Sequence, residues 1–92
     1  MQDKIKIYID DLTKENYSLL AMNEKITEQR KALKKRLCDL TDGFGSTDDM
    51  KEMGALCGRL LGMAMIFRQN CKDIRKNSAI IRGLRDGSIK EI

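Results

Sequence analysis

A seven-residue repeat of apolar side chains constrains this chain more than any other feature. In the first half an apolar residue stands at every seventh position without a break, which is typical of a coiled-coil helix. The repeat consists of Ile5, Leu12, Leu19, Ile26, Leu33 and Leu40. A second row, four residues further on each time, is polar in its middle and reads Ile9, Asn16, Asn23, Arg30 and Leu37. We therefore predict a long helix over residues 3–41.

The second half of the chain carries a repeat of its own. Large apolar residues again recur at intervals of seven, at Met53, Leu60, Phe67, Ile74 and Ile81. The row four residues after them is uniformly small and consists of Cys57, Ala64, Cys71 and Ser78. Because the chain contains no proline, nothing in its composition breaks either helix. We predict a second helix over residues 47–82, with Cys57 and Cys71 packed in its seam.

Residues 42–46 read as a turn between the two helices. Gly43 or Gly45 can adopt the left-handed conformation that ends a helix, and Ser46 or Thr47 can cap the next one. In the register that a turn of this length favours, Leu12 lies level with Ser78, so that large side chains face small ones. In the alternate layers of that register Asn16 faces Ile74. The sequence thus predicts an all-α, antiparallel two-helix coiled-coil hairpin, a single domain over residues 1–92, with a short flexible C-terminal tail over 83–92.

A lone hairpin cannot bury all the apolar residues of its second helix. Several of them point away from the predicted seam, and three glycines spaced by four lie among them. Glycine inside a helix costs about 1 kcal/mol relative to alanine, which suggests that another backbone approaches there. We expect the hairpin to dimerise into a four-helix bundle or to bind another protein. The predicted interface residues are Gly54, Gly58, Gly62, Leu61, Met65, Ile66 and Ile80.

Positive charge is concentrated in the second half of the chain. Residues 1–52 hold 10 basic and 11 acidic side chains, whereas residues 53–92 hold 8 basic and 3 acidic ones. Helical spacing gathers part of this charge into one stripe, formed by Arg68, Lys72, Arg75, Lys76 and Arg82. Lys31, Lys34 and Lys35 form a second cluster. These residues could bind an acidic protein or a nucleic acid backbone, or could simply be solvated.

The composition argues against an enzyme. A chain of 92 residues encloses few deep clefts, and the absence of histidine removes the commonest general base and metal ligand. Three cysteines without a CxxC pair suit neither a disulfide framework nor a zinc site, so we expect no metal, cofactor or small-molecule substrate. No apolar run is long enough to span a membrane, and we expect a reducing, cytoplasmic location. The predicted function is a small non-enzymatic protein-protein interaction module; the alternative is a nucleic-acid-associated accessory or regulatory protein.

Overall fold

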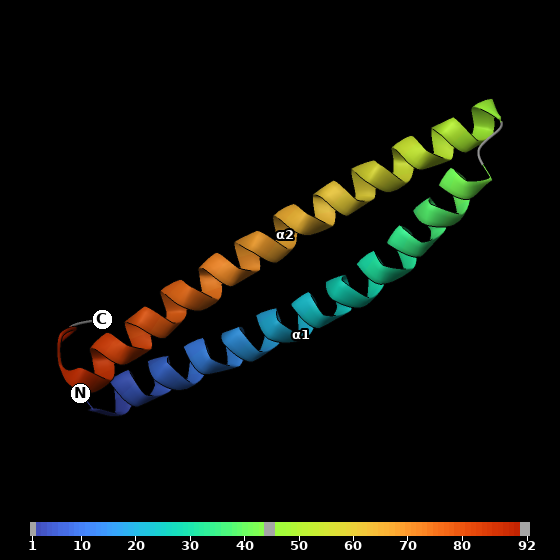
Figure 1. Ribbon diagram of the computed structural model, residues 1–92. Helices are drawn as coiled ribbons and strands as arrows, with labels where there is room; N and C mark the ends of the chain where they lie inside the picture. Colours follow the sequence, from blue (N-terminus) through green and yellow to red (C-terminus); the bar gives the residue numbers. More distant parts are fainter. Residues whose placement is uncertain (1, 44–45, 91–92) are drawn as a thin grey trace. The chain divides into compact units, whose positions relative to one another are not determined.

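Two long helices make up the fold, as the sequence predicts. The computed structural model describes residues 2–43 and 46–90. Helix α1 spans Gln2–Asp42 and helix α2 spans Thr47–Asp86, and the two pack against each other as a helical hairpin (Figure 1). The predicted C-terminal tail begins at residue 83, but α2 continues to Asp86, and Gly83 and Leu84 in its last turns are buried.

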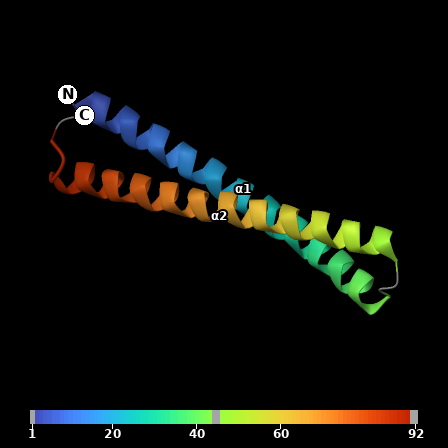
Figure 2. The ribbon, with the colours of Figure 1, turned by 90° about the horizontal axis from the view of Figure 1, so that it is seen from above.

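The chain divides into two compact units, and each contains a piece of both helices. We call the unit formed by Met1–Met22 and Gln69–Ile92 the terminal unit, and the unit formed by Asn23–Arg68 the turn unit. Figures 1 and 2 show the start of α1 and the end of α2 side by side in the terminal unit. The turn unit holds the rest of α1, the connection between the helices and the start of α2.

The seam of α1 agrees with the predicted repeat in each unit. Every residue of both predicted rows is buried or half-buried. The most enclosed apolar members are Leu12, Ile26 and Leu40, which keep 6–7% of their surface exposed. Asn23, in the polar middle of the second row, is equally buried at 6%. The polar residues of this row therefore lie in the seam and are not turned out to solvent.

The seam of α2 differs from the prediction in one of its two rows. The row from Met53 to Ile81 is half-buried, as expected. The companion row, however, begins at Leu56 and not at Cys57, because Leu56 is buried whereas Cys57 is exposed. That row continues at sevens through Met63, Asn70, Asn77 and Leu84. The predicted position of Cys57 in the seam is therefore wrong, whereas Ala64, Cys71 and Ser78 of the predicted small row are half-buried beside this more buried row.

The register of the terminal unit also differs from the predicted one. The side-chain amide of Asn77 donates a hydrogen bond of 3.0 Å to Oδ1 of Asn16. Asn16 in turn donates to the hydroxyl oxygen of Ser78 at 3.4 Å. Asn16 thus faces Asn77 and not Ile74, a shift of about one helical turn. The physical reason is that a buried amide opposite an isoleucine would leave donors and acceptors unpaired, whereas a second amide satisfies them.

The start of α2 is capped by a serine. Ser46 Oγ accepts a hydrogen bond of 3.1 Å from the backbone amide of Asp49, and Asp48 and Asp49 lie in the first turn, where the helix dipole favours negative charge. The predicted role of Ser46 is therefore confirmed. Gly43 does not adopt a left-handed conformation, and Gly45, the other glycine predicted to do so, lies outside the described residues.

Candidate functional site

The side of α2 that faces away from its seam is apolar through much of the turn unit. Between Lys51 and Arg68 the exposed positions of α2 carry one charge, that of Arg59, although such positions of a coiled coil are normally polar. We call these residues the outer apolar stripe; they are Gly54, Ala55, Gly58, Leu61, Gly62 and Met65. Leu61 and Met65 are 68% and 67% exposed. The stripe is thus a solvent-facing surface with the composition of a buried one.

The three glycines of the stripe have no packing role within the hairpin. A Cβ atom built on Gly54, Gly58 or Gly62 meets nothing within 4 Å apart from the helix's own backbone. The fold would therefore accept alanine at each position, with a gain in helix propensity of about 1 kcal/mol. Their presence leaves a shallow, side-chain-free track on the helix beside Leu61 and Met65.

Two further predicted interface residues lie in different surroundings. Ile66, in the turn unit, is 50% exposed and flanks the stripe. Ile80 belongs to the terminal unit and is half-buried there. Met50, which the sequence did not single out, is 59% exposed and lies in the turn unit, one turn before Gly54. The sequence could have indicated Met50 as part of this surface, because it precedes Gly54 by four residues and residues four apart lie on the same face of a helix.

The predicted basic residues are all exposed. This holds for Arg68, Lys72, Arg75, Lys76 and Arg82 on α2 and for Lys31, Lys34 and Lys35 on α1. Within residues 2–43 and 46–90 the only ion pair joins Arg36 to Glu52. None of the predicted basic residues therefore has a carboxylate within 4 Å among the described residues. The basic stripe on α2, formed by Arg68, Lys72, Arg75, Lys76 and Arg82, therefore keeps its full charge available for a partner.

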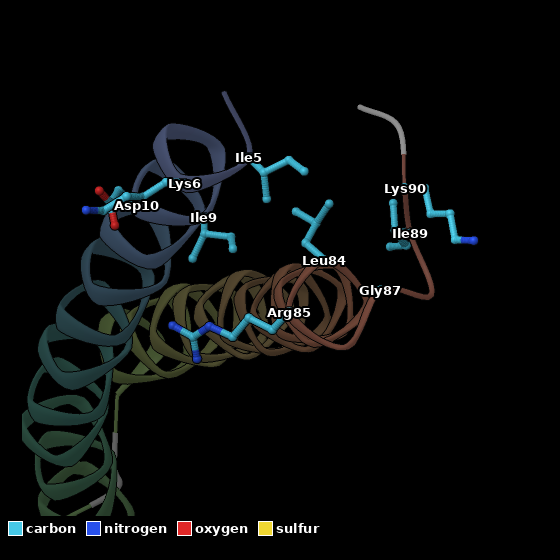
Figure 3. A pocket seen from close by; sticks show the side chains of 9 residues that line it. All are labelled: Ile5, Lys6, Ile9, Asp10, Leu84, Arg85, Gly87, Ile89 and Lys90. Atoms are coloured by element: carbon cyan, nitrogen blue, oxygen red, sulfur yellow. The ribbon is translucent and has the colours of Figure 1, made fainter. Parts of the chain in front are cut away.

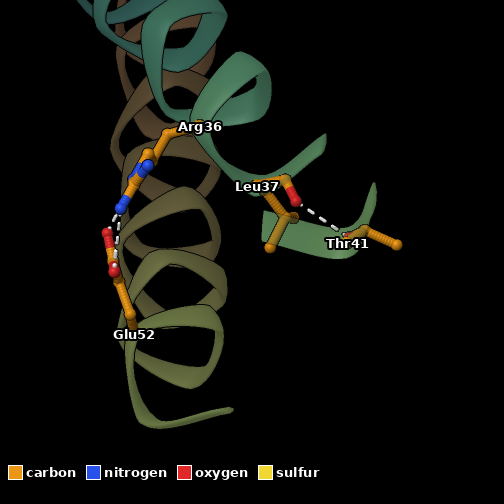
Figure 4. Close-up of polar contacts among 4 residues, drawn as sticks. All are labelled: Arg36, Leu37, Thr41 and Glu52. Carbon is orange, nitrogen blue, oxygen red and sulfur yellow. Dashed lines mark hydrogen bonds and ion pairs between the residues drawn. The ribbon is translucent and has the colours of Figure 1, made fainter. Parts of the chain in front are cut away.

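The pair between Arg36 and Glu52 links the two helices inside the turn unit (Figure 4). Arg36 donates two hydrogen bonds, of 2.8 and 3.2 Å, to the two carboxylate oxygens of Glu52. These hydrogen bonds lower the pKa of Glu52 and raise that of Arg36. Figure 4 also shows the Thr41 hydroxyl donating to the carbonyl of Leu37 four residues back, as the hydroxyls of Thr13 and Thr27 do to Ile9 and Asn23. This pairing satisfies hydroxyls on the flank of α1 without a partner across the seam.

Arg30 is the one basic residue that points into a seam. Its Nε atom is buried and, in the part of the chain that the structure describes, has no hydrogen-bond partner. With Thr27, Lys31 and Lys34 it lines a small cavity of about 150 Å³ in the turn unit. A buried N–H without an acceptor costs about 1–3 kcal/mol, so Arg30 is a weak point in this seam.

The terminal unit contains a larger cavity, of about 590 Å³, which the sequence did not predict. In Figure 3, Ile5 and Ile9 of α1 and Leu84 of α2 project toward the same space. The third wall is the segment that follows α2. Gly87, at φ 84°, reverses the chain, and the backbone amide of Ile89 then donates a 2.9 Å hydrogen bond to the carbonyl of Gly83. Charged residues complete the lining: Lys6, Asp10, Arg85 and Lys90.

Two interactions hold this returning segment. The carboxylate of Asp86 accepts a 2.8 Å hydrogen bond from the Ser88 backbone amide. Hydrogen bonding to the side chain of Ser88, and to a smaller extent to its backbone, lowers the pKa of Asp86. The Ile89 side chain also lies against Gly83, because a Cβ built on Gly83 would come within 2.6 Å of Ile89 Cδ1. Gly83 is therefore a glycine for a steric reason.

This contact predicts a non-additive pair of substitutions. Gly83→Ala alone should change the free energy of unfolding little, because the helix-propensity gain of about 1 kcal/mol is offset by displacement of Ile89. In an Ile89→Ala background the same change should stabilise by about 1 kcal/mol, since Cβ of residue 89 lies at an ordinary 3.6 Å from the new methyl group. Urea unfolding of the four chains measures the coupling. Equal effects of Gly83→Ala in both backgrounds would contradict the contact.

Comparisons with known proteins add no further constraint. No protein-family model, curated protein or solved structure matches the chain. Among residues 2–43 and 46–90 no cluster of three or more histidine, cysteine or acidic side chains could hold a metal ion. In the same residues, neither helix has a stretch long and apolar enough to cross a membrane.

Proposed function

We propose that the protein is a non-enzymatic interaction module that binds another polypeptide through the outer apolar stripe of α2. The observation that carries this proposal is the exposure of Leu61 and Met65 in a stretch of α2 where Arg59 is the one exposed charged residue between Lys51 and Arg68. Large apolar side chains spaced by four on an exposed helix are the anchors by which helices bind other helices or grooves. The neighbouring glycines, Gly54, Gly58 and Gly62, let a partner backbone come close.

The proposal predicts which substitutions abolish binding. Tagged chain would be incubated with extract of the native source, and co-purifying chains identified by mass spectrometry. Leu61→Glu or Met65→Glu should reduce the captured partner at least about tenfold, because each removes an apolar anchor worth about 1.5–3 kcal/mol when buried. Ala79→Glu is the matched control, since it places the same charge at an exposed position of α2 outside the stripe. Capture that is insensitive to Leu61→Glu and Met65→Glu would overturn the proposal.

A second candidate is binding to a nucleic acid backbone through the basic stripe. The exposure of Arg68, Lys72, Arg75 and Arg82, with no ion pair to a described residue, favours it. The same variants distinguish the two functions. Under this alternative, charge reversal at Arg68 and Arg75 abolishes binding while Leu61→Glu leaves it intact, and the affinity falls steeply as salt rises from about 50 to 200 mM.

A further inference from the structure

We infer that the cavity of the terminal unit binds an aliphatic carboxylate, with its hydrocarbon chain on the apolar walls and its carboxylate at Arg85. The sequence did not predict a ligand of this class. All residues that line the cavity belong to the terminal unit, whereas the outer apolar stripe belongs to the turn unit. The inference therefore does not depend on the proposed function.

The cavity has the size and the walls of a small-molecule site. Its volume of about 590 Å³ lies within the range of about 300–1,000 Å³ that such sites occupy. Its apolar side chains come from three parts of the chain: Ile5 and Ile9 from α1, Leu84 from α2, and Ile89 from the returning segment (Figure 3). The three isoleucines are half-buried. A hydrocarbon chain in the cavity would cover apolar surface that the hairpin leaves in contact with water.

The third wall is held in place by the chain itself. The Ile89 amide donates its 2.9 Å hydrogen bond to the carbonyl of Gly83, and the Ser88 amide donates to the carboxylate of Asp86 at 2.8 Å. Both contacts lie outside the seam between the helices. Because the wall is fixed by these bonds, a ligand does not have to order the segment on binding, which lowers the entropic cost of the complex.

The charged residues of the lining favour an anionic ligand. Three of them are basic, Lys6, Arg85 and Lys90, and one is acidic, Asp10. None of the four forms an ion pair with a described residue. Asp10 follows Lys6 by four residues on α1, where its charge chiefly offsets that of this lysine. Arg85 is then left for the ligand, and a guanidinium binds a carboxylate through two parallel hydrogen bonds.

Decanoate is the probe, and an amide proton–nitrogen NMR titration of the full chain locates it. The signals of Gly83, Gly87 and Ile89 should shift together and saturate, with a dissociation constant of about 0.1–2 mM for a ligand of this size. Octanoate should bind at least about fivefold more weakly, because each buried methylene contributes up to about fourfold in affinity. The signals of Leu61 and Met65 in the outer apolar stripe should not shift.

The first variant tests the apolar wall. Ile89→Asp removes the apolar side chain of the returning segment and leaves both helices intact, because α2 ends at Asp86. It should weaken decanoate binding at least about tenfold, since it removes apolar contact and adds a charge that repels the carboxylate. Ala79→Asp is the matched control, because it adds the same charge at an exposed position of α2 in the same unit. Its dissociation constant should stay within about twofold of wild type.

The second variant tests the carboxylate contact. Arg85→Gln should weaken decanoate binding at least about tenfold, because a charge-assisted hydrogen bond is lost. The affinity for octanol, an uncharged aliphatic alcohol, should change by less than about twofold in the same variant. Arg82→Gln is the control, since it removes an arginine three residues earlier on α2 that does not line the cavity. It should leave the affinity for decanoate within about twofold of wild type.

The outcomes are distinct from those of partner capture. The inference is overturned if the returning segment shows no saturable shift up to about 10 mM decanoate, or if the shifts are confined to the outer apolar stripe. Equal weakening of decanoate and octanol in Arg85→Gln, or an equal loss in Arg82→Gln, overturns the contact with Arg85. None of these results affects the proposed function, because the substituted residues lie outside the outer apolar stripe.

Discussion

Replacing Arg30 by leucine should raise the free energy of unfolding by about 2 kcal/mol. The guanidinium Nε of Arg30 is buried without an acceptor among the described residues, and removing this donor recovers a penalty of about 1–3 kcal/mol. Leucine continues the apolar seam formed by Ile26 and Leu33, one turn to either side. The gain in unfolding free energy stays below the sum of the recovered hydrogen-bond penalty and the added apolar burial, because the aliphatic part of the arginine side chain already covers apolar surface. Urea unfolding followed by far-UV circular dichroism measures it.

Lys31→Leu provides the control for this substitution. It removes the same unit of charge from the adjacent position of α1, and Lys31 is exposed. Its effect should therefore stay within about 0.5 kcal/mol of wild type. If the two leucine variants are equally stable, or if Arg30→Leu is the less stable one, Arg30 contributes favourably to the seam. The interpretation of Arg30 as a destabilising residue would then be wrong. All chains are compared at one protein concentration, because self-association would shift apparent stability.

Substitutions at the layer formed by Asn16 and Asn77 should have opposite effects when made singly and together. Asn16→Ala removes the acceptor of the Asn77 amide, which is only 6% exposed. Leaving that group unpaired should destabilise the protein by about 2 kcal/mol. Changing Asn16→Leu with Asn77→Leu replaces both polar groups by apolar ones of similar size, and should stabilise by about 1–2 kcal/mol.

A double-mutant cycle with the two leucine substitutions isolates the interaction between these residues. Asn16→Leu leaves the buried Asn77 amide without its acceptor, and Asn77→Leu leaves the half-buried Asn16 with only its hydrogen bond to Ser78. The two changes should therefore couple by about 2 kcal/mol. Additive effects, with a coupling below about 0.5 kcal/mol, would show that the two asparagines act independently and that the register rests on other contacts. The leucine pair should also lose register specificity, because a polar pair in a seam penalises slipped alignments.

The sequence predicted α1 correctly because both of its rows recur at sevens, and a helix that repeats in this way has only one face to bury. The error in α2 has a physical cause. The choice of Cys57, Ala64, Cys71 and Ser78 rested on their spacing of four residues from the first row. The predicted register rested on matching large side chains with small ones, whereas the structure pairs Asn16 with Asn77. A buried amide needs a hydrogen-bonding partner more than a leucine needs a small neighbour. The spacing of Asn70 and Asn77 by seven, like that of Asn16 and Asn23, was the available signal.

The candidate sites differ in how far the sequence could predict them. The exposure of Leu61, Met65 and Ile66 was predictable, because helical spacing alone turns them away from the seam. The cavity of the terminal unit was not, because its third wall depends on Gly87 returning Ile89 onto Gly83. That return is a contact between a helix and the segment after it, and glycines near a helix end indicate only that the helix stops.

The two interhelical contacts differ in how much chain must be closed to form them. Arg36 and Glu52 are 16 residues apart, whereas Asn16 and Asn77 are 61 residues apart. Loop-closure entropy grows with the logarithm of this separation, so the longer closure costs about 1.2 kcal/mol more from an unfolded chain. The turn unit should therefore acquire its interhelical contacts before the terminal unit in the folding transition state. Folding would then start near Ser46. The hydrogen bond between Asn16 and Asn77, which fixes the register, would form only after most of the interhelical contacts are in place.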